Sequence, residues 1–594
     1  MKRNQYRFII PGFMMASIIL FACKSFLDKP PMGAFSQGVL ANKTGVQAGL
    51  VGAYHSLLGR VNWGGAPSNW VFGSVNGGDS YKGSTPSDQG DIVPLEIYAY
   101  NVNNPYLNEK WVVVYDGIAR TNEVLRLMAL ATDLSAAEIK TMQAEARFLR
   151  GYWHLEAKRM WQNVPFVDET VSVTNSFEKV KNVDEAGNYI DIWPQIEAEL
   201  QFAYDNLPET QPQVGRANKW AAAAFLAKAY MIQKKYAQAK TLLDALIANG
   251  KTAGNKKYAL VNFQDNFNAS TDNSAETVFA VQMSVNDGSG TNGNYGDNLN
   301  FPNSGGPGGC CGFNNPSISL ANAYKTDAGG LPMPDTYNAG PNVSDPAGPY
   351  TGFLDPRIDL TMGRPGIPYL DWGPHPGPTW IRDPGTNGWF SPRKNVYAQS
   401  QNNLLSSKET SFWGPTQMDA NNVNLIRFAD IILWAAEVET EIGSLAQALT
   451  YVNMIRNRAA DPTGWVYTGS AYNAATGKYT TQVTPAANYK ISLYPAGYFT
   501  DKATARKAIM FERKLELAME GHRFFDLQRW NTGGSMAAEL NAYIAAEKPR
   551  PSIFSVNTSA VFTANKNEIY PIPQAIIDYE NSRGGIHIKQ NPGY

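Results

Sequence analysis

The chain has 594 residues, of which 43% are hydrophobic and 17% are charged, and its formal net charge is -1. This balance provides no overall field that would attract a polyanion, so we expect no nucleic-acid partner. Three cysteines are too few for a disulfide framework or a thiolate metal site, and no catalytic or nucleotide-binding motif occurs. We therefore expect no cofactor and no metal. The adjacent Cys310 and Cys311 are compatible with a bridge or with two reduced thiols.

Residues 1–22 are predicted to be an export signal. Basic residues precede an apolar run that is too short to span a bilayer. The run ends in LFAC at 20–23, which resembles a bacterial lipobox, although Phe21 is bulkier than usual. In a lipobox, cleavage precedes a cysteine that is then acylated. We expect lipidation at Cys23 rather than an incidental cysteine, followed by a lipidated N-terminus and tether over 23–44.

Apolar residues recur at steps of three and four along several segments, which predicts amphipathic helices. Ser135 and Glu138 form a capping box before one of them, and Pro165 ends it near Asn163. Rows of alanine in 219–249 resemble a tetratricopeptide helix pair, because small residues let two helices approach closely. The segments predicted to be helical are 45–58, 111–129, 135–163, 188–207, 219–249, 424–459 and 504–530.

The last of these helices, 504–530, is crowded with charged residues, including Glu512, Arg513, Glu516 and Asp526. Such a cluster is compatible with acid/base chemistry. Opposite charges three or four positions apart are more typical of a salt-bridged helix surface. We therefore interpret these residues as structural.

Two regions, 61–105 and 250–423, lack a helical period. Both combine turn dipeptides with aromatic and amide side chains, and aromatic residues are too frequent in them for a disordered chain. We predict an ordered, largely irregular insertion over 250–423, with short strands near 276–282 and 393–397. A further short strand is expected at 568–573.

Several motifs resemble the SusD/RagB family and occur in the order expected for it. They are CKSFLD at 23–28, AEARFLR at 144–150 with NVP at 163–165, IRFAD at 426–430, ER at 512–513, GHRFFDL at 521–527 and YPIP at 570–573. The resemblance runs from Cys23 to the C-terminus. It implies one domain over 45–594 with a mainly α fold. A tetratricopeptide-like helix-pair scaffold, 106–249 and 424–594, would carry the loop-rich, ligand-binding parts 61–105 and 250–423.

The resemblance also implies a function. By this resemblance, the chain is expected to be a lipoprotein that is anchored in the cell outer membrane and faces the exterior. It would act as a lid on a SusC-like TonB-dependent transporter. The lid captures an oligo- or polysaccharide for import and performs no chemistry. A peptide-binding lid of the RagB type is the main alternative. A glycoside hydrolase is a third, and would require two carboxylates about 5–10 Å apart beside an aromatic cleft.

Sugar rings stack on Trp and Tyr through their C–H faces, and their hydroxyls pair with Asp, Asn, Arg or Lys. Both loop regions hold this mixture, although packing inside the protein is the other role open to each aromatic residue. The candidates in the first region are Trp70, Asp79, Tyr81 and Lys82. The candidates in the second region are Asn294, Tyr295, Phe313, Asn314, Tyr369, Asp371, Trp372, His375, Trp380, Arg382 and Trp389.

Overall fold

The computed structural model describes residues 37–59, 62–172, 175–345, 348–409, 417–582 and 584–594. The predicted signal peptide and Cys23 lie outside these ranges. Part of the predicted tether is helical, because α4 already begins at Lys43. No helix in the described ranges combines the length and the apolar character needed to cross a bilayer.

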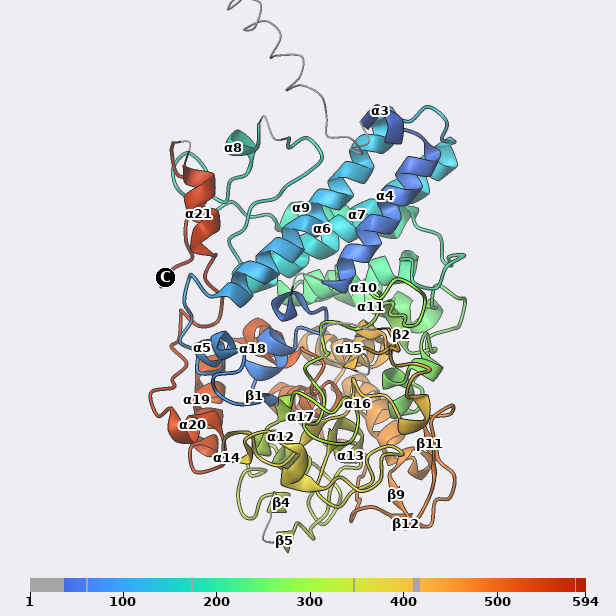
Figure 1. Ribbon diagram of the computed structural model, residues 1–594, viewed down its shortest axis with the longest axis vertical. Coiled ribbons are helices and arrows are strands. Elements are labelled where there is room, and N and C mark those ends of the chain that lie inside the picture. The colour runs from blue at the N-terminus through green and yellow to red at the C-terminus, as the bar shows by residue number, and fades with distance from the viewer. Residues whose placement is uncertain (1–36, 60–61, 173–174, 346–347, 410–416, 583) are drawn as a thin grey trace, which may run out of the picture.

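Long helices stack side by side to form the scaffold (Figure 1). They are α4 (Lys43–His55), α6 (Pro105–Leu130), α7 (Ala136–Trp161), α9 (Trp193–Asn206), α10 (Lys219–Ile232), α11 (Tyr236–Asn249), α15 (Phe428–Ile442), α16 (Leu445–Ala460) and α17 (Lys502–Glu516). Each helix packs against the next one in this series. This succession confirms the predicted tetratricopeptide-like scaffold.

Local sequence explains where these helices begin and pack. The side chain of Ser135 accepts the Glu138 amide and the side chain of Glu138 accepts the Ser135 amide, so the predicted capping box starts α7. Asn218 caps α10 by accepting the Ala221 amide at 2.9 Å. The alanines of α10 are at most 1% exposed, which lets this helix pack closely against its neighbours.

The contact between α6 and α7 depends on one glycine. A Cβ at Gly117 would lie 2.2 Å from the indole of Trp153. We expect Gly117→Ala to lower the free energy of unfolding by about 1–3 kcal/mol, because overpacking outweighs the gain in helix propensity. A Cβ at Gly52 in α4 would have no atom within 4 Å, so Gly52→Ala serves as the matched control. In urea melts, Gly52→Ala should be neutral or stabilising; equal losses in both variants would contradict this account.

The predicted single helix over 504–530 is wrong. The structure has α17, which ends at Glu516, and a separate helix α18 (Arg523–Trp530). Between them Met519 and Gly521 have φ values of 65° and 72°, a left-handed conformation that cannot continue a right-handed helix. This turn carries the Gly521 amide to the side chain of Ser74, 3.1 Å away.

The charges of this segment are structural, as predicted, but they are buried rather than on a helix surface. Glu516 is 0% exposed, and its carboxylate contacts Arg357, Arg427 and Arg458. Burial alone would raise the pKa of Glu516, but these three cations outweigh it and hold the pKa well below its usual value. Arg357 comes from the insertion, so the ion pairs fasten the insertion to α17.

Shorter helices and strands punctuate the rest of the described chain, which is otherwise largely turns and loops (Figure 1). The helices are α3 (Gln37–Leu40), α5 (Val93–Glu96), α8 (Ser176–Lys179), α12 (Ile318–Ala323), α13 (Ile358–Thr361), α14 (Pro384–Asn387), α19 (Ser535–Glu547), α20 (Ile553–Val556) and α21 (Gln574–Asn581). The strands form six antiparallel pairs: β1 (Ser80–Gly83) with β3 (Phe313–Pro316), β2 (Thr277–Val281) with β8 (Val423–Arg427), β4 (Ser344–Asp345) with β5 (Gly348–Pro349), β6 (Met362–Gly363) with β7 (Ser391–Pro392), β9 (Tyr467–Thr468) with β12 (Thr484–Pro485), and β10 (Tyr472–Asn473) with β11 (Lys478–Tyr479).

The mainly α fold with a large, irregular insertion is therefore confirmed, and β2 matches the strand expected near 276–282. Three local predictions are wrong. The segment 393–397 is a turn that follows β7, 424–427 is a strand rather than the start of a helix, and 568–573 forms no strand. In 568–573 the amide of Tyr570 is instead bonded to the carbonyl of Met160, at 3.0 Å, which ties the C-terminal segment to α7.

Candidate functional site

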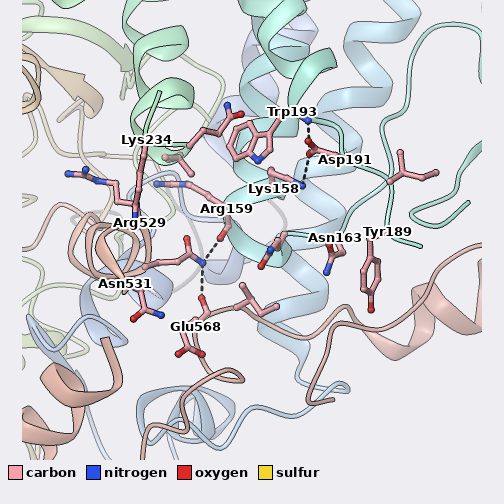
Figure 2. Close-up of a pocket in the computed structure, with 16 residues that line it drawn as sticks. Lys158, Arg159, Asn163, Tyr189, Asp191, Trp193, Lys234, Arg529, Asn531 and Glu568 are labelled. Carbon is pink, nitrogen blue, oxygen red and sulfur yellow. Dashed lines mark hydrogen bonds and ion pairs between the residues drawn. The ribbon is translucent and has the colours of Figure 1, made fainter. Parts of the chain in front are cut away.

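Hollows of different character open on the described part of the molecule. One, of about 590 Å³, lies on the helical scaffold where α7, α10 and α18 end, and none of the predicted ligand contacts lines it (Figure 2). Another, of about 60 Å³, is lined by Asn294 and Asn314, two of the predicted contacts. The remaining candidates lie in the interior or along the nearby loops of the insertion.

Two aromatic candidates of the first loop region are buried. Trp70 begins a π-helical turn, η3 (Trp70–Val75), is 1% exposed and donates its indole N–H to the Gly296 carbonyl at 3.1 Å. Tyr81 is fully buried and donates its hydroxyl to Glu547. Both rings therefore pack inside the protein and are not among the proposed ligand contacts.

Asp79 and Lys82 are also held inside the protein. Burial raises the pKa of Asp79 to about 6, and its carboxylate accepts the Met519 amide at 3.1 Å. Burial lowers the pKa of Lys82 to about 8, and its ammonium donates to the carbonyls of Thr85 and Asp88 at 2.8 and 2.7 Å. Lys82 thus holds the loop that follows β1, and Asp79 holds the turn after α17; neither side chain faces the solvent.

Strand β1 joins the two predicted loop regions. It pairs with β3, so that Gly83 lies opposite Phe313, and the Ser84 amide extends the contact by donating to the Gly312 carbonyl at 2.6 Å. The ammonium of Lys82 lies 4.9 Å from the centre of the Phe313 ring. The two predicted loop regions, which are far apart in sequence, are thus brought side by side.

Several candidates of the insertion are packing residues. Phe313 and Tyr369 are fully buried. His375 is 1% exposed, and burial lowers its pKa to about 3. The amide of Gly377 donates to His375 Nδ1 at 3.0 Å, so the Nε2–H donates to Ser391 Oγ at 2.9 Å. This neutral ring holds a turn of the insertion together.

Four further candidates are partly exposed, but each is engaged in the fold. Trp389 packs against the hydrophobic cluster around α12. Tyr295 is stacked on Trp63, with ring centres 6.1 Å apart. Trp372 donates its indole N–H to a main-chain carbonyl at 2.9 Å. Asp371 accepts two main-chain amides. Each of these side chains is therefore partly covered by the contacts that it makes within the fold.

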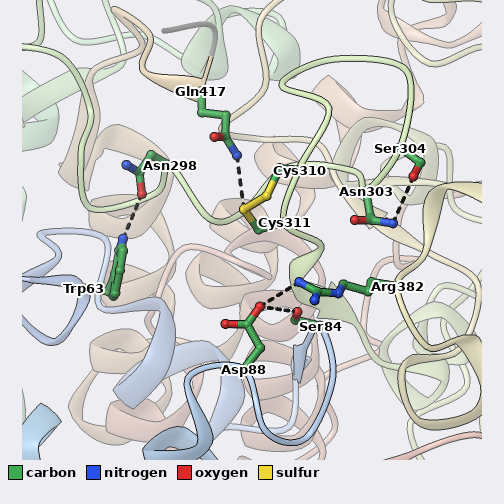
Figure 3. The surroundings of a disulfide bond; sticks show 10 residues. All are labelled: Trp63, Ser84, Asp88, Asn298, Asn303, Ser304, Cys310, Cys311, Arg382 and Gln417. Atoms are coloured by element: carbon green, nitrogen blue, oxygen red, sulfur yellow. Dashed lines mark hydrogen bonds and ion pairs between the residues drawn. A yellow bond between two sulfur atoms is a disulfide. The ribbon is translucent and has the colours of Figure 1, made fainter. Parts of the chain in front are cut away.

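Trp380 and Arg382 lie beside the glycine-rich loop 302–312. Trp380 is half-buried and lies against the glycine-rich loop, where a Cβ at Gly306 would come within 2.5 Å of its ring. The Arg382 side chain is 41% exposed and donates to Asp88 at 2.8 Å. Asp88 also accepts the Ser84 hydroxyl at 2.7 Å (Figure 3). An aromatic ring and a guanidinium with further donors thus lie against the loop 302–312, and a carboxylate pairs with the guanidinium.

The adjacent cysteines are bridged, which settles the alternative that the sequence left open. Cys311 is 6% exposed, and its sulfur accepts the side-chain amide of Gln417 at 3.4 Å, whereas Cys310 is partly exposed (Figure 3). The same loop carries Asn303 and Ser304, which add polar groups beside Arg382. We call Trp380, Arg382, Asp88 and this loop, 302–312, the loop surface.

The 60 Å³ hollow is a polar pocket lined by asparagines and one ion pair. Asn314 accepts the Ser80 hydroxyl at 2.6 Å. Lys394 donates to Glu520 at 2.6 Å, and burial lowers the pKa of Lys394 to about 8. The Asn421 side-chain amide nitrogen has no partner within the described ranges. The volume suits water molecules or a single polar group rather than a sugar ring.

The prediction missed Asp88, the polar residues of loop 302–312 and the asparagines contributed by 421–424. The run DANNVN at 419–424, directly before and within β8, is the signal that could have identified the last group. Within the described ranges, no group of three or more His, Cys, Asp or Glu side chains is placed to hold a metal ion.

Comparisons with known proteins assign the chain to a family. A family model described as the SusD family matches residues 275–594, and one described as starch-binding associating with outer membrane matches 80–231. The SusD-like protein P25 of Formosa agariphila is 24% identical, over 86% of this chain and 87% of its own length.

Two solved structures share the fold. A laminarin-binding SusD-like protein has a TM-score of 0.62 and 22% identity, over 93% of this chain and 100% of its own. Surface glycan-binding protein A from Bacteroides thetaiotaomicron, in complex with laminarihexaose, has a TM-score of 0.55 and 17% identity, over 93% and 99% of the two chains. The first family model alone covers more than half of the sequence, including β3, α15, α17, α18 and the C-terminal segment, so the chain belongs to the SusD family.

Proposed function

We propose that this protein captures a glycan at the loop surface. The observation that carries the proposal is that Trp380 and Arg382 both lie against the loop 302–312, while Arg382 pairs with Asp88 in the loop after β1. A partly exposed indole offers a stacking edge, and the charged pair offers both donors and acceptors for sugar hydroxyls. Two fold neighbours described as laminarin-binding or bound to laminarihexaose support the same ligand class.

The proposal includes the setting of this binding. Cys23 would carry the lipid, so that the mature chain is anchored in the outer membrane and faces the exterior. There it would act as a lid on a SusC-like TonB-dependent transporter and pass the glycan on for import. The family description that mentions association with the outer membrane supports this location. Mass spectrometry of the membrane-extracted protein should find acyl chains on Cys23, and Cys23→Ala should release the protein from the membrane.

A peptide ligand is the second candidate function, and one observation favours it. Half of the predicted Trp, Tyr and Phe contacts are buried, whereas the polar pocket presents asparagine side chains. Amide groups pair readily with a peptide backbone.

Isothermal titration calorimetry of the purified chain against neutral hexasaccharides, including laminarihexaose, and against a peptide pool separates the two candidates. Saccharide binding with no peptide binding supports the glycan lid; the reverse result would transfer the function to peptides. The same samples, analysed for released sugar, test for binding without hydrolysis. Release of sugar by the purified protein would revive the glycosidase alternative.

A further inference from the structure

The 590 Å³ hollow of the helical scaffold is separate from the loop surface and is built from distant segments. The ends of α7, α10 and α18 form its walls, together with 189–193 before α9 and the C-terminal residues 568–569 (Figure 2). Its volume falls in the range of small-molecule sites.

The charges around this hollow are largely balanced. Lys158 lies 3.3 Å from the carboxylate of Asp191. Arg159 and Arg529 donate to acids behind the wall, Glu156 at 2.8 Å and Glu437 at 2.6 Å. The hollow therefore has no strong field that would select an ionic ligand, and a neutral ligand with many hydroxyl groups fits this balance better.

Free hydrogen-bonding groups and an aromatic ring face the same space. Lys234 and Gln162 are exposed, and neither side chain has a hydrogen-bond or ion-pair partner within the described ranges. Trp193 is half-buried, and the ammonium of Lys158 lies 5.7 Å from its ring centre. A ring for stacking beside two unused polar side chains is a combination that recognises sugars.

The hollow does not end at Lys234. This residue also lines a second hollow, of about 510 Å³, which extends to Trp530. Trp530, Arg506 and Met510 in turn line a third hollow, of about 430 Å³. The three adjoining hollows form a track along the scaffold, with Trp193 near one end and Trp530 in the middle.

We propose that this track, which we call the scaffold track, is a second binding site for a neutral glycan chain. Trp193 would stack on a sugar ring, and Lys234 and Gln162 would pair with its hydroxyl groups. The proposal rests on the proposed function, because it assigns the same ligand class to a second part of the molecule. Its advantage would be avidity, since one polysaccharide could contact both sites. A protein partner is the competing occupant of this surface.

Calorimetry with the same neutral hexasaccharides tests the track in the full chain. The wild type should show two classes of site. Trp193→Ala/Lys234→Ala should lose one class, with its affinity lowered at least about tenfold. The matched control is Trp465→Ala/Lys478→Ala, the same residue types beside a hollow of about 160 Å³, and it should bind as the wild type does.

In case Trp193→Ala impairs folding, a single substitution, Lys234→Glu, is tested as well. Lys234 is exposed and has no partner among the described residues, so this variant should fold. It should also weaken the class of saccharide site that is assigned to the scaffold track. Unchanged binding in both track variants, while Trp380→Ala/Arg382→Ala loses binding, would overturn the scaffold track alone and would favour a protein partner there. Absence of any saccharide binding in the wild type would overturn both the track and the proposed function.

Discussion

Glu516→Gln is expected to lower the free energy of unfolding by about 3–5 kcal/mol, the usual cost of removing one partner from a buried ion pair. Glu516 is fully buried, and Arg357 and Arg427 donate to its carboxylate at 3.0 and 2.6 Å. A neutral amide would leave the positive charges of Arg357 and Arg427 only partly compensated in a region with little access to water. Urea denaturation followed by circular dichroism measures the change.

The control is Glu441→Gln. Glu441 forms two hydrogen bonds with Arg506, at 2.6 and 2.7 Å, but the Arg506 side chain is 47% exposed. Water and salt screen such a pair, so its loss should cost no more than about 1 kcal/mol. Equal losses in the two variants would show that burial does not set the strength of these contacts.

Trp380→Ala/Arg382→Ala is expected to lower the affinity of one class of saccharide site at least about tenfold. The substitutions remove the stacking face and the exposed guanidinium of the loop surface. Neither side chain is part of the buried ion pairs that hold the insertion on α17, so the variant should keep a melting temperature close to that of the wild type. Calorimetry with laminarihexaose and the other hexasaccharides gives the affinities.

The matched control for this variant is Trp465→Ala/Arg120→Ala. Arg120 pairs with Asp116 at the surface at 2.7 Å, as Arg382 pairs with Asp88, but Arg120 lies on α6. This control should bind saccharide normally. Full affinity in Trp380→Ala/Arg382→Ala, with a correctly folded protein, would show that the glycan binds elsewhere.

Sequence periodicity predicted the scaffold well, because each helix is largely specified by its own residues. The stripe of α7 and the capping pair Ser135 and Glu138 are local signals, and the structure contains both. The break between α17 and α18 was missed because it depends on backbone conformation at Met519 and Gly521, which apolar spacing does not record. The burial of Glu516 was missed because its partner Arg357 lies 159 residues away.

The candidate site was harder to predict. Composition alone could not distinguish an aromatic residue that packs inside a loop from one that faces solvent, since both occur among turn residues. Trp70 and Trp380 lie in similar sequence surroundings, yet the first is 1% exposed and the second is half-buried. The difference arises when Gly296 approaches Trp70 through folding of the insertion. Only long-range contacts decide whether an aromatic residue in such a loop is buried or faces solvent.

The pairing of β1 with β3 has a consequence for how this protein can diversify. The pairing joins 80–83 to 313–316, and every residue of both strands is buried, so side chains that face the solvent take no part in it. The segment that carries Trp380 and Arg382 leaves and re-enters the framework at the β6–β7 pair, and it touches the loop after β1 through Arg382–Asp88 and Asn387–Ser84. Descendants of this gene could therefore exchange that segment and acquire a new sugar preference while inheriting the same framework.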